Sequence, residues 1–262
     1  MRRRHYRSRR ANDDGIESAP RKSLTSGARI RYIRGRGPQR SRSVEATYHA
    51  SRDGAVAFWQ HAHSVGEDPL RTLRRAMTDR LLNDLIEAIH ASDRKLVLAV
   101  TGGGSSVIST LLATPGASRL LLEAVVPYSA NALNDWLGGQ PDQACSESTA
   151  RALAMSAWVR ARQLAPDVDP GQLIGLGCTA SIATDRPKRG AHRIFIAVQT
   201  SVCTNSFSCV LTRKDRSRDE EESLAATIAL MALAKRCGVD VSAVQTQLQS
   251  VLASDEPITR RG

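Results

Sequence analysis

The chain contains 262 residues, of which 41% are hydrophobic, and it has a formal net charge of +11. This length is sufficient to bury a full hydrophobic core. No stretch approaches the ~20 apolar residues of a membrane span, which argues against a membrane protein. We therefore expect a cytoplasmic protein with no membrane partner.

The positive charge is concentrated at the N-terminus. Residues 1–43 contain 14 basic and 3 acidic residues, so their net charge equals that of the whole chain, and the remaining residues contain 23 of each kind. This segment is rich in Arg, Ser and Gly and has little apolar periodicity, so it is predicted to be disordered in isolation. Two functions stay open for it: nucleic-acid binding through counterion release, or a solvated extension.

Residues 44–69 are predicted to be a linker or a short helix, with the helix at 55–61. His61 and His63 have a spacing that a metal could use, but no cluster of further ligands completes a site, so we expect no metal. The five cysteines form no C-x-x-C pair. They are predicted to be buried free thiols, and no cofactor is expected.

From residue 70 onward the pattern becomes that of an ordered domain, which we expect to extend to residue 255. Apolar residues at intervals of three and four predict an amphipathic helix packed on the core: Leu70, Leu73, Met77, Leu81, Leu85 and Ile89. The next apolar run, 95–101, ends in Gly102, Gly103 and Gly104 and is followed by helical spacing. This arrangement predicts a buried strand, a tight turn and a helix.

The glycine turn is a candidate ligand site. Glycines allow the backbone to approach a bound group, and the free N–H groups that begin a helix attract an anion such as a phosphate or a developing oxyanion. A tight turn without a ligand is the alternative. The sequence matches neither a P-loop nor the G-x-G-x-x-G fingerprint of dinucleotide-binding proteins.

Further along the chain, strands and helices alternate. Apolar runs predict strands at 120–126 and 173–178, and a hairpin at 193–200 and 206–212. Helices are predicted at 131–137, from Ser146, from the S-x-x-E capping box at Ser217, and at 241–252, with a polar tail after the last one. We therefore expect an α/β fold, a three-layer αβα sandwich with a mostly parallel sheet and an antiparallel hairpin. Because ligands bind at the carboxyl ends of such strands, Thr179, Ala180 and Ser181 are expected to share a crevice with the glycine turn.

The order of these motifs resembles the C-terminal domain of the CinA competence/damage-inducible family, whose active members deamidate nicotinamide mononucleotide. The resemblance rests on four segments: Pro115-Gly116-Ala117-Ser118, Val125-Val126-Pro127-Tyr128-Ser129, Ser146-Glu147 and Thr179. The TGGGS and RPKRG segments are similar to a divergent subgroup that also occurs fused to nucleotidylyltransferase-like domains. The resemblance implies a pyridine-nucleotide context, as in NAD salvage, and a homo-oligomer.

Departures from the family pattern bear on the chemistry. Family members read A-E-S-C-T-G-G before the first helix, which places Thr101 at the serine proposed as the nucleophile. Leu133 stands where the family has a lysine after the tyrosine, and the G-D-R-E segment is similar to the sequence around Arg218. A hydroxyl nucleophile needs a neighbouring base, and leucine cannot provide one.

The resemblance and the glycine turn together give the candidate site. As an amidohydrolase, the chain would use Thr101, Tyr128 and Thr179 in catalysis. The expected ligand-binding residues are Gly102, Gly103, Gly104, Ser105, Ser106, Ser129, Ser181 and Arg218. Three functions remain open: an amidase acting on nicotinamide mononucleotide, a nucleotide-binding module that has lost catalysis, and a nucleic-acid-associated protein acting through residues 1–43.

Overall fold

A computed structural model describes residues 69–185, 190–212 and 215–262, with side chains described from residue 79 onward. The predictions for residues 1–43, for the helix at 55–61, and for His61 and His63 lie outside the described residues. Leu73–Gly262 form one compact unit, and the elements below belong to it apart from the first turn of the first helix.

A mixed β-sheet forms the middle layer. Its strand order is β2-β1-β3-β4-β5-β6. The strands are β1 (Lys95–Gly102), β2 (Leu121–Val125), β3 (Leu173–Ser181), β4 (His192–Gln199), β5 (Thr204–Leu211) and β6 (Thr259–Arg261). Strands β2, β1 and β3 are parallel, and every pairing from β3 to β6 is antiparallel. The three predicted strands and the hairpin β4–β5 are thus confirmed, and the antiparallel part extends beyond the hairpin.

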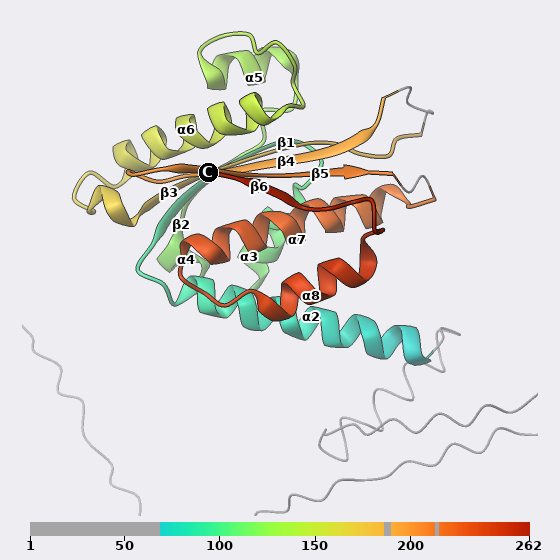
Figure 1. The fold of residues 1–262 in the computed structure, drawn as a ribbon. Helices are drawn as coiled ribbons and strands as arrows, with labels where there is room; N and C mark the ends of the chain where they lie inside the picture. Colours follow the sequence, from blue (N-terminus) through green and yellow to red (C-terminus); the bar gives the residue numbers. More distant parts are fainter. Residues whose placement is uncertain (1–68, 186–189, 213–214) are drawn as a thin grey trace, which may run out of the picture. The chain divides into compact units, whose positions relative to one another are not determined.

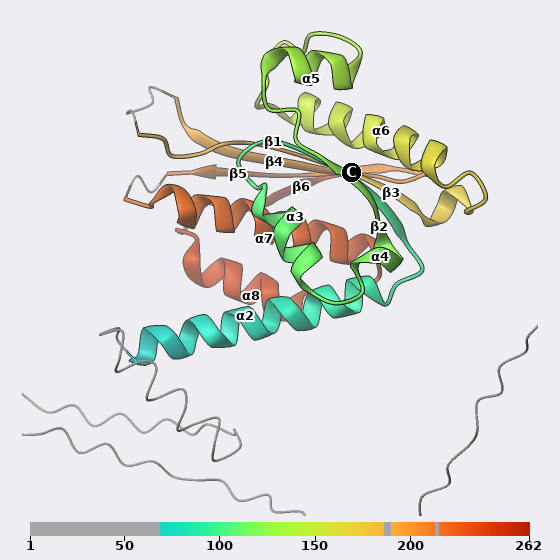
Figure 2. The same cartoon turned by 180° about the vertical axis from the view of Figure 1, so that it is seen from behind.

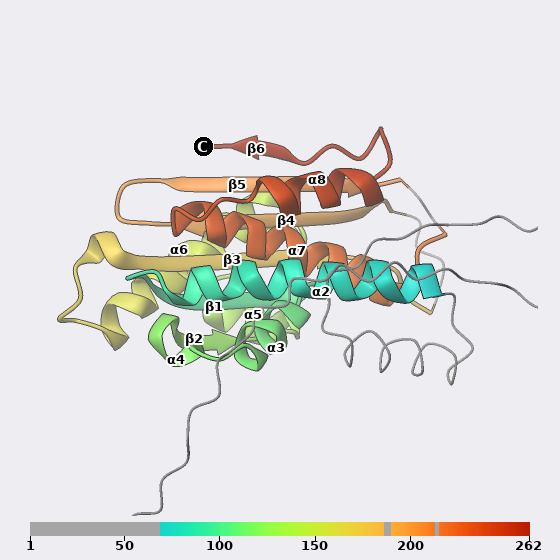
Figure 3. The ribbon, with the colours of Figure 1, turned by 90° about the horizontal axis from the view of Figure 1, so that it is seen from below.

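Helices cover both faces of the sheet, which confirms the αβα sandwich (Figure 1). They are α2 (Pro69–His90), α3 (Ser106–Ala113), α4 (Ala117–Leu120), α5 (Ala130–Leu137), α6 (Glu147–Leu164), α7 (Arg218–Arg236) and α8 (Ser242–Val251), with a 3₁₀ turn at Pro170–Gln172. Helices α5 and α6 lie on one face (Figure 1). On the other face lie α3 and α4, near β1 and β2 (Figure 2), together with α2, α7 and α8 (Figure 3).

Helices α6 and α7 begin directly after a serine whose side chain caps the first turn. Ser146 caps α6, because its Oγ accepts a hydrogen bond of 3.1 Å from the Thr149 N–H. Ser217 and Glu220 form the predicted capping box at the start of α7. Both predicted helix starts are therefore confirmed.

Most of the hydrophobic core lies on the α7 face. It joins Leu96, Leu98 and Val100 of β1 to α2, α3, α7 and α8. Three smaller clusters lie on the other face; one of them joins Ala99 to Leu133 of α5 and Leu153 of α6. Since side chains alternate along a strand, odd-numbered residues of β1 point to the α5–α6 face and even-numbered ones to the α7 face.

Two glycines on β3 bring the sheet into direct contact with α6. A Cβ at Gly175 would lie 2.1 Å from the carbonyl oxygen of Ala154, and a Cβ at Gly177 would lie 2.3 Å from that of Ala150. No side chain fits at either position. The backbone of α6 therefore rests on the backbone of β3.

Two elements differ from the predictions. Helix α4 is a single turn, too short to produce an apolar periodicity. Strand β6 lies within the predicted polar tail. Its residues are all exposed and it pairs with β5 through the backbone, so the sequence carried no hydrophobic signal for it.

Candidate functional site

The turn between β1 and α3 requires glycine. Gly102 has φ 78° and Gly104 has φ 94°, a region that side chains disfavour. A Cβ at Gly102 would also lie 2.2 Å from the carbonyl oxygen of Ala180 on β3. The glycines thus let the turn pass close to the end of β3, and the Gly103 N–H donates a hydrogen bond of 3.0 Å to the same Ala180 oxygen.

The N–H groups of this turn are bound by a side chain of the protein itself. Glu222 of α7 accepts hydrogen bonds from the Gly104 N–H (2.7 Å), the Ser106 N–H (2.9 Å) and the Ser105 hydroxyl (3.0 Å). A carboxylate therefore occupies the place that the sequence suggested for a phosphate or an oxyanion. Sequence reasoning missed Glu222, and the signal available was the acidic run 219–222 at the start of a helix.

The environment of Glu222 favours its ionised form. Burial alone would raise the pKa of the carboxyl group. The hydrogen bonds from Gly104, Ser106 and Ser105, together with the nearby positive charge of Arg218, outweigh burial and lower the pKa below its ordinary value. Glu222 is consequently a carboxylate at neutral pH.

Thr101 and Thr179 are brought together at the carboxyl ends of β1 and β3. They are direct partners in the parallel pairing, and both are buried. Both side chains point to the α5–α6 face, whereas Glu222 approaches from α7 on the other face. The Thr101 hydroxyl donates a 2.9 Å hydrogen bond to the Pro127 carbonyl, and the Thr179 hydroxyl donates one of 2.7 Å to the Ala144 carbonyl.

Ser181 extends this polar row. It follows Thr179 by two residues on β3, so it points to the same face. Its partner in the antiparallel pairing is Arg193 of β4. The Cys145 thiol lies above both strands, 3.9 Å from the Thr179 carbonyl oxygen and 3.6 Å from the Arg193 carbonyl oxygen. Sequence reasoning did not select Arg193.

The predicted site residues that follow β2, Tyr128 and Ser129, have surroundings different from those of Thr101 and Thr179. Tyr128 is 67% exposed. Ser129 caps α5, because its Oγ accepts a 3.2 Å hydrogen bond from the Ala132 N–H. Leu133, at the position of the family lysine, is 3% exposed and packs in the apolar cluster with Ala99 and Leu153.

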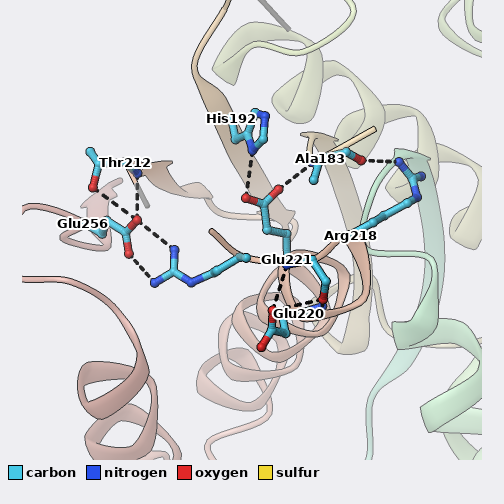
Figure 4. Close-up of polar contacts among 9 residues, drawn as sticks. Ala183, His192, Thr212, Arg218, Glu220, Glu221 and Glu256 are labelled. Atoms are coloured by element: carbon cyan, nitrogen blue, oxygen red, sulfur yellow. Dashed lines mark hydrogen bonds and ion pairs between the residues drawn. The ribbon is translucent and has the colours of Figure 1, made fainter. Parts of the chain in front are cut away.

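Arg218 and Glu221, at the start of α7, both contact Ala183 (Figure 4). The Arg218 guanidinium donates a 2.9 Å hydrogen bond to the Ala183 carbonyl, which follows β3. The fully buried Glu221 accepts a 2.6 Å hydrogen bond from the Ala183 N–H and lies 2.8 Å from Nδ1 of His192. These contacts fix α7 to the end of β3 and the start of β4.

Figure 4 also shows Glu256, which approaches from the segment after α8. Its buried carboxylate forms an ion pair of 2.6 Å with Arg216 and accepts a 2.7 Å hydrogen bond from the Thr212 N–H. The pair closes the same end of α7. Because both partners are buried and hydrogen-bonded to each other, we assign it a structural role.

The cysteines are free thiols, as predicted, but only Cys178 and Cys209 are buried. Burial raises the pKa of Cys178 well above its ordinary value and that of Cys209 to about 11. Within the described ranges, no group of three or more His, Cys, Asp or Glu side chains could hold a metal ion. In the same ranges, no helix combines the length and apolar character needed to cross a membrane.

Two surface hollows lie away from the predicted site residues. One, of about 510 Å³, lies between α2 and α3 beside Glu87 and Thr110. The other, of about 560 Å³, lies between α7, α8 and β5 beside Lys235 and Phe207. None of the predicted site residues lines either hollow.

No family model matches the sequence, and no curated protein matches it. Its structural neighbours are CinA-superfamily proteins. A competence-damaged protein (CinA) superfamily member from Klebsiella pneumoniae has 17% identity and a TM-score of 0.47, covering 62% of this chain and 98% of that one. A competence or damage-inducible protein from Enterobacter asburiae has 16% identity and a TM-score of 0.46, covering 60% of this chain and 96% of that one. The competence/damage inducible protein CihA from Agrobacterium tumefaciens has 18% identity and a TM-score of 0.44, covering 64% of this chain and 95% of that one.

Proposed function

We propose that this chain is a CinA-like protein that binds a pyridine nucleotide or a related phosphorylated small molecule and does not hydrolyse it. The order of the sequence motifs supports the ligand class. The proposed site is the row of Thr101, Thr179 and Ser181 at the carboxyl ends of β1 and β3, where α/β folds bind ligands.

The observation that carries the loss of catalysis is the hydrogen bond from the Thr101 hydroxyl to the Pro127 carbonyl. A carbonyl oxygen accepts a hydrogen bond but does not remove the proton, so this contact leaves the hydroxyl unactivated. Leu133 adds support, because an apolar cluster fills the position where the family has a lysine. Amide hydrolysis also needs donors for the developing oxyanion, and Glu222 occupies those of Gly104 and Ser106.

Two measurements on the full chain test the proposal. Calorimetry against pyridine and adenine nucleotides should detect binding, with nicotinamide mononucleotide among the ligands. Ammonia release from nicotinamide mononucleotide should be the same for the wild type and for Thr101→Ala. A wild-type turnover near ~10 s⁻¹ that Thr101→Ala abolishes would establish the amidase instead.

The resemblance also supports a homo-oligomer, which light scattering would test, and the cytoplasmic location expected from the sequence would be tested by cell fractionation. For nucleic acid, we propose residues 1–43 as the contact, since they carry the whole charge excess. Replacing their arginines by glutamine should then abolish salt-dependent binding to RNA or DNA. Binding with an unchanged salt dependence would place the contact elsewhere.

A further inference from the structure

Arg193 is placed in the proposed ligand site by strand register. It pairs with Ser181, and Ser181 shares a face with Thr179, whose partner on β1 is Thr101. Directly paired residues of neighbouring strands point to the same face, with Cβ atoms ~5 Å apart. Thr101, Thr179, Ser181 and Arg193 therefore form a staggered row on the α5–α6 face. Ser181 and Arg193 lie two residues further along the strands than Thr179 and its β4 partner, Phe195.

The guanidinium of Arg193 has no hydrogen-bond partner among the described residues, unlike those of Arg216 and Arg218. Its Nε is buried and has no hydrogen-bond partner, and no described group forms an ion pair with it. By contrast, Arg216 binds Glu256 and Arg218 donates to the Ala183 carbonyl. Because arginine stays protonated in proteins, a buried donor on this group is an unsatisfied part of a positive charge. Such a group is costly unless an acceptor completes it.

Among the other anion-binding groups proposed from the sequence, the N–H groups of the glycine turn and the side chain of Arg218 are already engaged. Glu222 takes the N–H groups of Gly104 and Ser106. Arg218 lies on α7, across the sheet from Thr101, and its charge acts on Glu222. Arg193 is thus the cationic side chain in the row that has no acceptor among the described residues.

We propose that Arg193 binds the anionic phosphate monoester group of the ligand. This inference rests on the proposed function and names the residue that gives the site its preference for a phosphorylated ligand. The planar guanidinium provides up to five donors in a geometry that matches phosphate oxygens. The Ser181 side chain, directly opposite on β3, lies beside the same group.

The first experiment uses inorganic phosphate as the probe and the melting temperature of the full chain as the readout. Millimolar phosphate should raise the melting temperature of the wild type and of the control Arg80→Gln, which changes an exposed arginine of α2, but not of Arg193→Gln. Residues 1–43 are identical in all three proteins, so phosphate bound there does not alter the comparison. Equal stabilisation of the wild type and Arg193→Gln would overturn the proposal.

A second readout separates ligand binding from a structural role. Without ligand, Arg193→Gln should melt at or above the wild-type temperature, because the substitution removes a buried N–H donor that has no partner. A marked decrease in the melting temperature of the ligand-free variant would show that Arg193 supports the fold, and would overturn the proposal.

The third experiment compares nicotinamide mononucleotide with nicotinamide riboside, which lacks only the phosphate. By calorimetry, the wild type should prefer the nucleotide by about tenfold or more, as expected for a charged hydrogen bond. Arg193→Gln should lose that preference and keep its affinity for the riboside, and Arg193→Lys should fall between them. If Arg193→Gln still preferred the nucleotide to the riboside, the proposal that Arg193 binds the phosphate would be overturned. If neither ligand binds, the proposed function fails, and the phosphate experiment alone decides the role of Arg193.

Discussion

The carboxylate of Glu222 lies 2.7 Å from the Gly104 N–H, although 118 residues separate the two positions in the chain. This contact joins the start of α7 to the turn that precedes α3. It satisfies N–H groups that the beginning of a helix otherwise leaves unpaired. The turn is therefore completed by an internal anion, and an external phosphate would have to displace it.

Replacing Glu222 by glutamine should destabilise the protein by about 1 kcal/mol at pH 7, a value reduced for the partial exposure of the side chain. The pKa of Glu222 is lower in the folded state than its ordinary value of 4.5. Its contribution is thus fully present above pH 4.5 and is lost as the pH falls through the lowered folded value. Urea unfolding at several pH values would measure this, with the exposed Glu87→Gln as control. A difference from wild type that persists at pH 2 would contradict the prediction.

Introducing the family lysine by Leu133→Lys should reduce stability by about 3 kcal/mol or more, because the side chain lies in an apolar cluster. The matched variant Leu133→Met preserves volume and polarity and should cost less than about 1.5 kcal/mol. Thermal melting of both variants checks the difference. Equal melting temperatures would mean that the cluster accepts a lysine, and would reopen the question of a catalytic base.

Gly102→Ala should destabilise the protein much more than Gly138→Ala. Both glycines have positive φ, 78° and 72°, so both variants carry a left-handed backbone penalty of about 1–2 kcal/mol. A Cβ at Gly102 would in addition lie 2.2 Å from the Ala180 carbonyl oxygen, whereas nothing lies within 4 Å at Gly138. Chemical unfolding should show an extra loss of about 2 kcal/mol or more for Gly102→Ala. Similar losses for the two variants would show that the turn can move away from β3.

Glu256→Gln should cost about 3–5 kcal/mol, because it leaves Arg216 as a buried charge with an uncharged partner. Replacing both residues, as Arg216→Met with Glu256→Leu, should cost less than the single change, since no buried charge then remains. Unfolding curves of the single and double variants decide this. A double variant that is less stable than the single one would show that the ion pair itself stabilises the fold.

Much of the fold could be predicted because its signals are local. Apolar runs marked β1, β2 and β3, and side chains such as Ser146 and Ser217 marked helix starts. Strand β6 could not be predicted in this way, because its pairing with β5 uses exposed polar residues. It is held by backbone hydrogen bonds to β5, which a pattern of side chains does not predict.

The site was predictable only in part, for a related reason. The sequence identified Thr101 and Thr179 as ends of apolar strands, and the parallel register does place them side by side. The partners of their hydroxyl groups, Pro127 and Ala144, depend on how the following loops fold back. The positions of Glu222 and Arg193 depend on tertiary packing and on strand register, neither of which a single sequence contains.

The contact of α6 with Gly175 and Gly177 has a consequence for the motions of this domain. At Gly175 and Gly177 no side chain separates the helix from β3, so the helix cannot shift toward the sheet there. Separation from the sheet would open the interior to water. Amide hydrogens near Ala154 should therefore exchange with solvent only when the whole domain unfolds. Any movement that admits a ligand would then have to come from the loops beside α6 and not from the helix itself.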